Sequence, residues 1–125
     1  MNPAVDMNIT SQGIHPKVVN RTQDSFYSHN GKGINLTRVL RHFGMDSAAL
    51  GFFGGFSGRY IVDSLREEGI PVHPIQVEET TRINIFLNDG SQEYKFVGEG
   101  AHVSPEAQQE LLKLLETLPD FDYFT

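Results

Sequence analysis

Apolar residues recur at helical spacing directly behind a glycine-rich turn in the first half of the chain. The positions i, i+3, i+4 and i+7 of one buried helical stripe are filled by Leu36, Val39, Leu40 and Phe43. Glycine adopts at little cost the left-handed conformation that ends a helix, so Gly44 favours an end at that point. The pattern therefore predicts a helix whose apolar stripe packs against a core.

A second apolar run and another helix follow. Residues 48–53 are mostly apolar and lead into the glycine-rich segment 54–58, which predicts a buried strand of a parallel sheet. The next helix carries Ile61 and Leu65 on its inward stripe. Residues 72–77 then predict a returning strand. A strand, a glycine turn and a helix form the βα unit of a wound sheet, so we expect an α/β fold.

Alternating apolar and polar residues predict a β-hairpin farther along. The alternating segments 82–87 and 93–97 flank the turn-rich link 88–91. Residues 7–27 also mix apolar and polar types, and a glycine and a proline interrupt any helical period. Several short extended pieces are therefore favoured there. Together these segments would form a small sheet apart from the wound core.

A third helix is predicted after Ser104. Serine is a favoured N-cap, Pro105 suits the first helical position, and Glu106 suits the positive end of the helix dipole. The leucines expected to bury against the sheet are Leu111, Leu112, Leu114, Leu115 and Leu118. The residues 121–125 would begin another strand.

Charge is distributed unevenly and limits the classes of partner. Residues 1–66 contain seven Lys or Arg and four Asp or Glu. Residues 67–125 contain three Lys or Arg and twelve Asp or Glu. The basic excess accompanies the glycine-rich segments, which favours a small anionic ligand. The net charge of −6 argues against nucleic acid as a partner.

Membrane and metal partners are not indicated. No apolar run approaches the roughly 18 residues of a membrane span, and the polar start lacks the features of a secretory leader. The chain has no cysteine, which agrees with a reducing compartment, so we expect a cytoplasmic location without a membrane partner. The five histidines lack the spacing of metal ligands, so we assign no metal to this chain.

The turn before the first helix is a candidate anion site. Gly31 and Gly33 straddle Lys32, and a glycine-rich turn that feeds a helix presents free N–H groups and the positive end of the helix dipole. A tight connection without any ligand is the alternative. The Walker A pattern would need Ser or Thr in place of Gly33, and the dinucleotide fingerprint would need glycine in place of Leu36.

Four segments, in chain order, resemble the pfkB (ribokinase-like) carbohydrate kinases. They read Asn-Pro-Ala-Val-Asp at 2–6, Gly-Lys-Gly-Ile-Asn at 31–35, a glycine-rich loop at 51–58 and Thr-Thr-Arg-Ile-Asn at 80–84. With Val-Asn-Arg at 19–21, the first and last segments resemble the phosphosugar branch. That branch holds 1-phosphofructokinase, tagatose-6-phosphate kinase and a minor 6-phosphofructokinase.

The resemblance implies a ribokinase-like wound sheet with a small β-sheet lid. It also implies an ATP-dependent sugar-phosphate kinase, first of all a 1-phosphofructokinase that converts fructose 1-phosphate to fructose 1,6-bisphosphate. Tagatose-6-phosphate kinase and the minor 6-phosphofructokinase are the alternatives within the branch.

Two departures from the family bear on this interpretation. Asn30 stands where the family usually has glycine, and because asparagine tolerates positive φ better than most residues, we expect the turn to survive. The Gly-Ala-Gly-Asp motif, which carries the family's catalytic base, is absent, and so is the ATP-binding half. We therefore expect the N-terminal part of a kinase, cut at both ends and inactive by itself. The base would lie beyond Thr125, and ATP and Mg²⁺ would be bound mainly by the remaining part.

The resemblance further implies a sugar-phosphate site in this chain. The residues expected to bind the substrate are Asp6, Arg21, Gly31, Lys32, Asn35 and Arg82. Asp6 and Asn35 would orient hydroxyls. Arg21 and Arg82 would hold the existing phosphate, because a guanidinium can grip a phosphate with two hydrogen bonds.

Three of these residues have alternative interpretations. Asp6 could be a turn-capping residue, and Arg82 could form a salt bridge between the lid and the core. Lys17 lies four residues before Arg21, so on a strand the two side chains would share a face and could meet one phosphate together. The resemblance favours Arg21 over Lys17.

We place the lid at about residues 7–28 and 80–98 and the α/β core at about residues 29–79 and 99–125. Phosphoryl transfer must exclude water, and a movable cover supplies that exclusion. The family's lid often pairs with a second subunit, so the resemblance implies a possible homodimer. Apolar hairpin residues suited to such pairing are Ile85, Leu87, Tyr94 and Phe96.

Two rival functions remain open. A non-catalytic sugar-phosphate-binding or oligomerisation module is the alternative from another class, and the residues encoded after Thr125 would distinguish it from a kinase. A ribose or nucleoside kinase of the same fold is the second rival. It predicts that Arg82→Ala has almost no effect.

Overall fold

The computed structural model describes residues 2–119 of the chain. The elements in these residues are, in order, β1 (Ala4–Ser11), β2 (Thr22–Asn30), α1 (Lys32–His42), β3 (Ala49–Gly54), α2 (Gly55–Glu67), β4 (Val72–Val77), β5 (Ile83–Asn88), β6 (Glu93–Phe96) and α3 (Pro105–Thr117). The α/β class is confirmed. The strand predicted at 121–125 lies outside the described residues.

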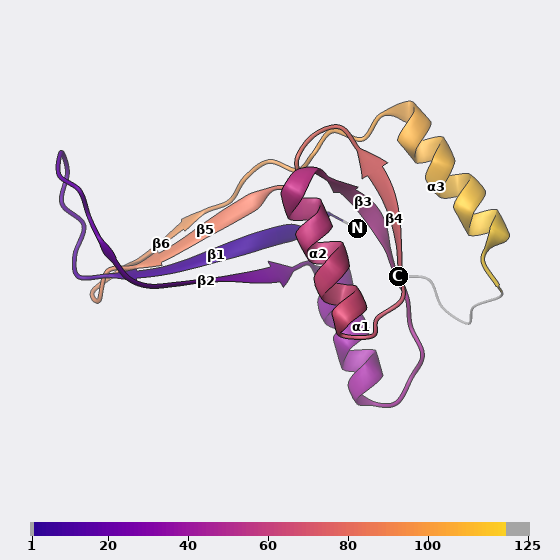
Figure 1. Ribbon diagram of the computed structural model, residues 1–125, viewed down its shortest axis with the longest axis horizontal. Helices are drawn as coiled ribbons and strands as arrows, with labels where there is room; N and C mark the ends of the chain where they lie inside the picture. Colours follow the sequence, from indigo (N-terminus) through magenta and orange to yellow (C-terminus); the bar gives the residue numbers. More distant parts are fainter. Residues whose placement is uncertain (1, 120–125) are drawn as a thin grey trace.

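Two separate sheets organise the molecule (Figure 1). One has four strands in the order β2-β1-β5-β6, in which β1 runs antiparallel to β2 and parallel to β5, and β5 runs antiparallel to β6. The other is the parallel pair β3-β4. Figure 1 shows the four-stranded sheet projecting away from the three helices, which gather around the parallel pair.

The four-stranded sheet contains the predicted hairpin, but the prediction for residues 7–27 is wrong. Strands β5 and β6 form the antiparallel hairpin expected around residues 88–91. Residues 7–27 do not form several short pieces, because β1 and β2 are two long strands. Gly13 and Pro16 lie in the connection at 12–21 and interrupt neither strand.

The pairing register gives the sheet two chemically different faces. Cross-strand partners point to the same face, and successive residues alternate. Met7 pairs with Tyr27 and Ile85, and Ile85 pairs with Phe96, so one apolar row crosses all four strands. Asp6 belongs to the opposite, more polar face. We call the side of the Met7 row the apolar face of the sheet.

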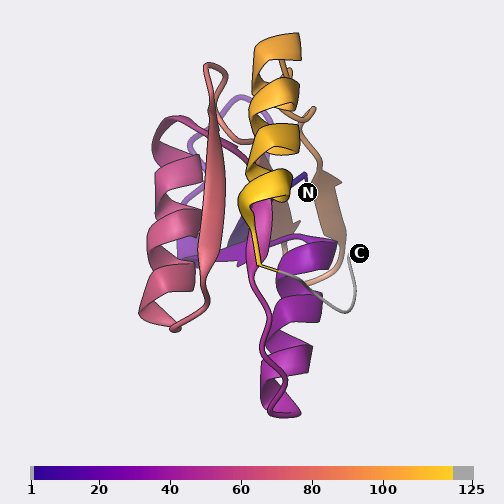
Figure 2. The same cartoon turned by 90° about the vertical axis from the view of Figure 1, so that its right-hand side faces the viewer.

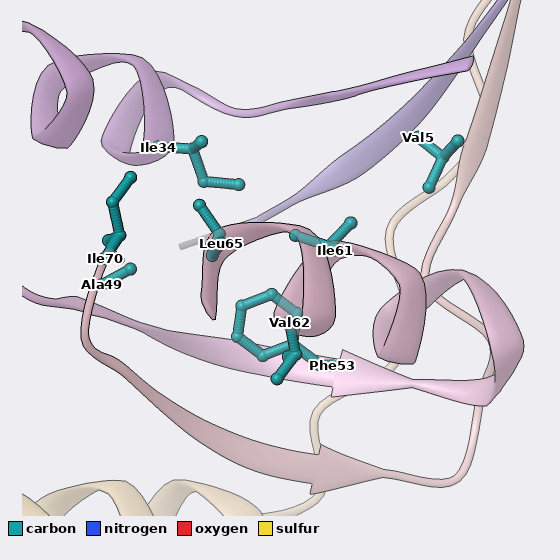
Figure 3. Packing of buried hydrophobic residues seen from close by; sticks show 8 residues of the cluster. All are labelled: Val5, Ile34, Ala49, Phe53, Ile61, Val62, Leu65 and Ile70. Atoms are coloured by element: carbon teal, nitrogen blue, oxygen red, sulfur yellow. The ribbon is translucent and has the colours of Figure 1, made fainter. Parts of the chain in front are cut away.

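Helix α2 buries its predicted stripe in the core. Ile61 and Leu65 are fully buried and pack with Phe53 of β3, with Val5 of β1 and with Ile34 of α1 (Figure 3). One cluster therefore joins the start of the four-stranded sheet to the parallel pair. Apolar burial of this kind is the main force that holds the two sheets together.

Helix α1 buries a different stripe from the one predicted. Leu36, Val39 and Phe43 are exposed, whereas Ile34 and Thr37 are buried. The helix starts at Lys32, and Leu40, the remaining residue of the predicted stripe, is half-buried, as is Arg38. Arg38 donates hydrogen bonds to Glu68, and Arg41 Nη1 donates to the carbonyl oxygen of Gly69 at 2.5 Å. Long polar side chains thus anchor this helix to the end of α2.

Helix α3 packs on β4, on the opposite side of the parallel pair from α2 (Figure 2). Ser104 caps it as predicted, because its hydroxyl oxygen accepts from the Ala107 N–H at 3.2 Å. The predicted burial of its leucines is wrong in part: Leu112 is 60% exposed, and Ala107 is the buried member of the helix. None of the helices that the structure describes is both long and apolar enough to span a membrane.

Candidate functional site

An open hollow of about 730 Å³ lies where the four-stranded sheet meets α1. Its walls come from the ends of β1 and β2, from the first turn of α1 and from the residues that lead into β5. Its lining residues are Asn2, Ala4, Asn30, Gly31, Lys32, Gly33, Leu36, Arg82 and Asn84. Three residues predicted to bind substrate, at positions 31, 32 and 82, therefore meet around one space.

A smaller hollow of about 370 Å³ lies farther along the sheet, around Asn8, Phe26 and Lys95. It contains none of the six residues that the sequence predicted to bind substrate. We therefore place the candidate site in the larger hollow.

The first turn of α1 leaves its backbone donors open to the hollow. The helix begins at Lys32 with Gly31 as N-cap, and no side chain caps it. The first turn carries no acidic residue. Free N–H groups, the positive end of the helix dipole and the exposed Lys32 ammonium together favour an anion at this end of the hollow.

Arg82 brings a second cation to the hollow from the segment between β4 and β5. Its Nη1 donates to the Gly98 carbonyl oxygen at 3.4 Å, and its buried Nε–H has no partner among residues 2–119. The alternative salt bridge between lid and core is not present in the part of the chain that the structure describes. A guanidinium with an unused donor is suited to a phosphate.

Asp6 lies just beneath the hollow, inside β1, so the turn-capping alternative is wrong. Its carboxylate is 5% exposed and is held by two amides. The Nδ2 of Asn30 donates to Oδ2 at 2.8 Å, and the Nδ2 of Asn84 donates to Oδ1 at 2.7 Å. Burial of a carboxylate is costly without such partners. Both asparagines line the hollow, and neither is among the site residues predicted from the sequence.

Asn35 joins the same hydrogen-bonded row from α1. Its Nδ2 donates to Oδ1 of Asn30 at 2.9 Å, and its side chain lies on the exposed side of the helix. Five of the six predicted residues, at positions 6, 31, 32, 35 and 82, are therefore brought to one region of the molecule.

Arg21 is the sixth, and the structure does not bring it there. It is the last residue of the connection between β1 and β2, and Figure 1 shows this connection at the end of the sheet away from the helices. The register pairs Ser11 with Thr22 and Ala4 with Asn30, so β2 separates Arg21 from the hollow by about 25 Å at ~3.3 Å per residue. The prediction that Lys17 and Arg21 share a strand face is wrong, because both lie in a loop and Lys17 has a φ of 63°.

Buried hydrogen bonds fix the segment that presents Arg82. Thr81 Oγ1 accepts from the Gly54 N–H at 3.0 Å, and Ser57 Oγ donates to the Thr81 carbonyl oxygen at 2.5 Å. Gly54 ends β3, and Ser57 lies in the first turn of α2. The carboxyl end of the parallel pair is thereby locked to the entry of β5. Sequence reasoning missed this contact, since its partners are more than 20 residues apart.

An ion-pair cluster behind the hollow joins α1, α2 and β2. Arg38 Nε donates to Glu68 Oε2 at 2.9 Å and Nη2 donates to Oε1 at 2.8 Å, while His29 Nε2 contacts both partners. The hydrogen bond from Arg38 lowers the pKa of Glu68 below its ordinary value. The same hydrogen bond raises the pKa of Arg38.

Among the described residues, no group of three or more His, Cys, Asp or Glu could hold a metal ion.

Comparison with known proteins gives consistent matches. The family model described as "pfkB family carbohydrate kinase" matches residues 2–125. The D-tagatose-1-phosphate kinase of Klebsiella oxytoca is 44% identical over 123 residues, which are 98% of this chain and 40% of that protein. The 1-phosphofructokinase of Bacillus subtilis is 35% identical over 122 residues, again 98% of this chain and 40% of the relative.

A solved structure agrees with these relatives. The phosphofructokinase-2 of Escherichia coli in complex with fructose-6-phosphate matches with a TM-score of 0.81 and 25% identity, over 94% of this chain and 40% of that one. The chain thus spans about two fifths of the length of the curated relatives it matches.

Proposed function

Because this chain belongs to the pfkB family of carbohydrate kinases, we propose that its whole protein transfers a phosphoryl group from ATP to a ketohexose phosphate. The first candidate reaction converts fructose 1-phosphate to fructose 1,6-bisphosphate. The observation that carries this proposal is the composition of the hollow. Two cationic side chains and three amides line it, and two of these amides, Asn30 and Asn84, hold the carboxylate of Asp6.

Each kind of group suits one part of such an acceptor. The guanidinium of Arg82, the ammonium of Lys32 and the free N–H groups in the first turn of α1 would hold the phosphate already present. Asn35 and Asp6, joined through Asn30, would orient sugar hydroxyls. A phosphosugar carries both kinds of group, whereas a free sugar would leave the cations without a partner.

The chemical step would need groups beyond this chain. Asp6 is the carboxylate nearest to the hollow, and two amides already enclose it, so it is poorly placed to take a proton from an acceptor. We propose that an aspartate outside residues 1–125 is the base. When bound, ATP supplies the phosphoryl group and Mg²⁺ neutralises its phosphates. The residues described here bind and orient the acceptor, and the chain alone is predicted to be inactive.

D-Tagatose 1-phosphate is the second candidate acceptor, because the relative named for that activity is 44% identical to this chain. It and fructose 1-phosphate are both ketohexose 1-phosphates. Tagatose 6-phosphate and fructose 6-phosphate are further alternatives, and a non-catalytic binding module is the alternative from another class.

The four-stranded sheet is proposed to act as a lid and as the surface of a homodimer. Its apolar face carries Tyr27, Ile85 and Phe96 in one row, and all three are exposed. Arg21 lies at the far end of this sheet from the hollow of its own copy. In the proposed dimer, Arg21 would serve the site of the other copy.

An assay of ATP-dependent turnover tests the proposed function. The full-length protein should be presented with the 1- and 6-phosphates of fructose and tagatose and with ribose, at equal concentrations. We expect the highest kcat/KM with a 1-phosphate and no turnover by residues 1–125 alone. Turnover with none of these acceptors would contradict a kinase and favour the binding module, and a preference for ribose would contradict the phosphosugar assignment.

A further inference from the structure

The side chain of Asn30 has a role that its backbone does not explain. The sequence suggested a turn residue that tolerates positive φ. In the structure it is the last residue of β2, and among described residues other than glycine only Lys17 has positive φ. The reason for an asparagine at this position therefore lies in its amide group.

The Asn30 amide connects two elements of the site. Its Oδ1 accepts from the Gly31 N–H at 2.7 Å and from Asn35 Nδ2 at 2.9 Å, and its Nδ2 donates to Asp6 Oδ2 at 2.8 Å. The orientation of the amide follows from these partners, because a backbone N–H only donates and a carboxylate only accepts. Asn30 thus joins β1 to the first turn of α1.

One donor of this amide remains unused. Nδ2 carries two hydrogens, and the bond to Asp6 uses one of them; no second acceptor is present among residues 2–119. Asn30 lines the hollow and is exposed to it. The unused N–H is therefore available to an oxygen atom of a bound molecule.

The side chain of Asn30 bonds to amide and carboxylate groups and not to the cations of the hollow. The positive charges of the hollow come from Lys32 on α1 and from Arg82 ahead of β5, whereas Asn30 contacts Asp6 and Asn35. An amide donor and a carboxylate acceptor beside each other match a sugar hydroxyl, which both accepts and donates hydrogen bonds.

We propose that Asn30 is a specificity-determining residue of the site: it holds Asp6 and Asn35 in one row and donates its remaining N–H to a hydroxyl of the ketohexose phosphate. This inference rests on the proposed function. Glycine at position 30 would leave Oδ2 of the buried Asp6 and Nδ2 of Asn35 without these partners. The sugar would then lose a contact that the phosphate does not share.

Kinetics of Asn30→Gly in the full-length protein test the proposal. We expect the KM for fructose 1-phosphate to rise about tenfold, while kcat and the KM for ATP stay within about twofold. Asn88→Gly is the matched control, because Asn88 is also the exposed last residue of a strand, at the other end of the sheet. Its KM should not change. An unchanged KM in Asn30→Gly would overturn the inference, and so would an equal rise in the KM for ATP.

The variant Asn30→Asp gives a second test, in which the pH dependence of KM is measured. A purely structural role of Asn30 would not change that pH dependence. The substitution would place a second carboxyl about 2.8 Å from Asp6 Oδ2, and two carboxyls so close share one proton, which raises the apparent pKa at which the pair loses its second proton. Lys32 and Arg82 are the cations that line the same hollow as position 30, and the neighbouring His29 contacts Arg38 and Glu68.

The KM of Asn30→Asp relative to the wild type should therefore fall as the pH is lowered from 8 to 6. A ratio that does not change with pH would contradict a direct link between position 30 and Asp6. If the wild type turned over no ketohexose phosphate, the proposed function itself would fail. If the wild type were active and both variants matched it, only the role of Asn30 would fail.

Discussion

Arg82 lines the hollow and has a buried donor without a partner in the described part of the chain, and this makes it the most informative single residue. Its Nε–H has no partner among residues 2–119, and its nearest bond, to the Gly98 carbonyl oxygen, is long. Removing the side chain would therefore disturb few contacts within the chain. It would remove a charged hydrogen-bond donor from any bound phosphate.

Arg82→Ala should weaken phosphosugar binding strongly. A hydrogen bond to a charged group contributes about 1.5–3 kcal/mol, so the KM for fructose 1-phosphate should rise roughly 10- to 100-fold. Arg66→Ala is the control, since its side chain is exposed on α2 away from the hollow. Steady-state kinetics of the two full-length variants give the comparison. A silent Arg82→Ala would favour an acceptor without a phosphate.

The pair formed by Arg38 and Glu68 predicts a pH dependence of stability. Arg38 lowers the pKa of Glu68 in the folded chain, so this stabilisation is present above the unfolded pKa of about 4.3 and is lost as the pH falls through the lower folded pKa. The pair is partly exposed, so it contributes at most about 1 kcal/mol.

Urea unfolding of wild type and Glu68→Gln at pH 7 and pH 3 measures this contribution. The variant should be less stable at pH 7 by up to about 1 kcal/mol and equal to the wild type at pH 3. An equal difference at both pH values would mean that the charge of Glu68 does not matter.

At the scale of residues, sequence reasoning found those that belong to a local motif. Lys32 and Arg82 stand in short segments with a recognisable pattern, and both line the hollow. The partners of Asp6 are 24 and 78 residues away in the chain, and no local pattern connects them. The sequence pointed to Asn30 because asparagine tolerates positive φ, whereas in the structure its side-chain amide bonds to Asp6, Gly31 and Asn35.

At the scale of elements, α1 shows why periodicity can select the wrong face of a helix. The periodicity argument uses only the spacing of apolar residues, and the residues from Leu36 to Phe43 contain a complete apolar stripe. The buried face begins at Ile34 and continues through Thr37 to Arg38, whose stem and charge pack against the end of α2. In helix α2 the predicted inward residues Ile61 and Leu65 are fully buried, so its face was predicted correctly.

The contact between the end of β3 and the segment before β5 predicts a steric effect. A Cβ on Gly54 would lie 2.0 Å from the Glu79 carbonyl oxygen and 2.6 Å from that of Val77. These are backbone atoms, so they cannot move aside without displacing the segment that carries Arg82. Gly54 itself has a negative φ, and backbone strain would therefore not contribute.

Gly54→Ala should lower the free energy of unfolding by more than about 2 kcal/mol. Gly44→Ala is the control: its φ is 73°, and no atom lies within 4 Å of its added Cβ, so it should show only a backbone penalty of about 1 kcal/mol. Denaturant unfolding of both variants measures the difference. A Gly54→Ala as stable as Gly44→Ala would show that the two segments separate easily.

At the scale of the whole molecule, the two faces of the four-stranded sheet predict how copies associate. Phe96 lies on the apolar face and is 60% exposed, while Phe26 lies on the opposite face and is 57% exposed. The two side chains are thus equal in type and in exposure. They differ in whether their neighbours across the sheet are apolar.

Phe96→Asp should therefore abolish the proposed dimer, because it buries a charge in an apolar interface, whereas Phe26→Asp should leave it intact. Sedimentation equilibrium of the full-length variants distinguishes monomer from dimer. Loss of the dimer in Phe26→Asp alone would place the interface on the other face, and a monomeric wild type would exclude the proposed assembly.

The class of the fold and the division into two sheets followed from local patterns such as the βα units and the hairpin. The pairing of β1 with β5 did not, because it joins residues almost 80 positions apart. That pairing brings Arg82 and Asn84 beside the start of β1 and so creates the hollow. Long-range pairing is therefore the part of the candidate site that the sequence alone could not supply.

A crystal structure of the full-length protein with fructose 1-phosphate is the most direct measurement. We predict that the phosphate lies against Arg82 and the first turn of α1, and that sugar hydroxyls lie within hydrogen-bond distance of Asn30 and Asn35. A sugar phosphate bound elsewhere, with Arg82 turned away from it, would contradict the site proposed for this chain.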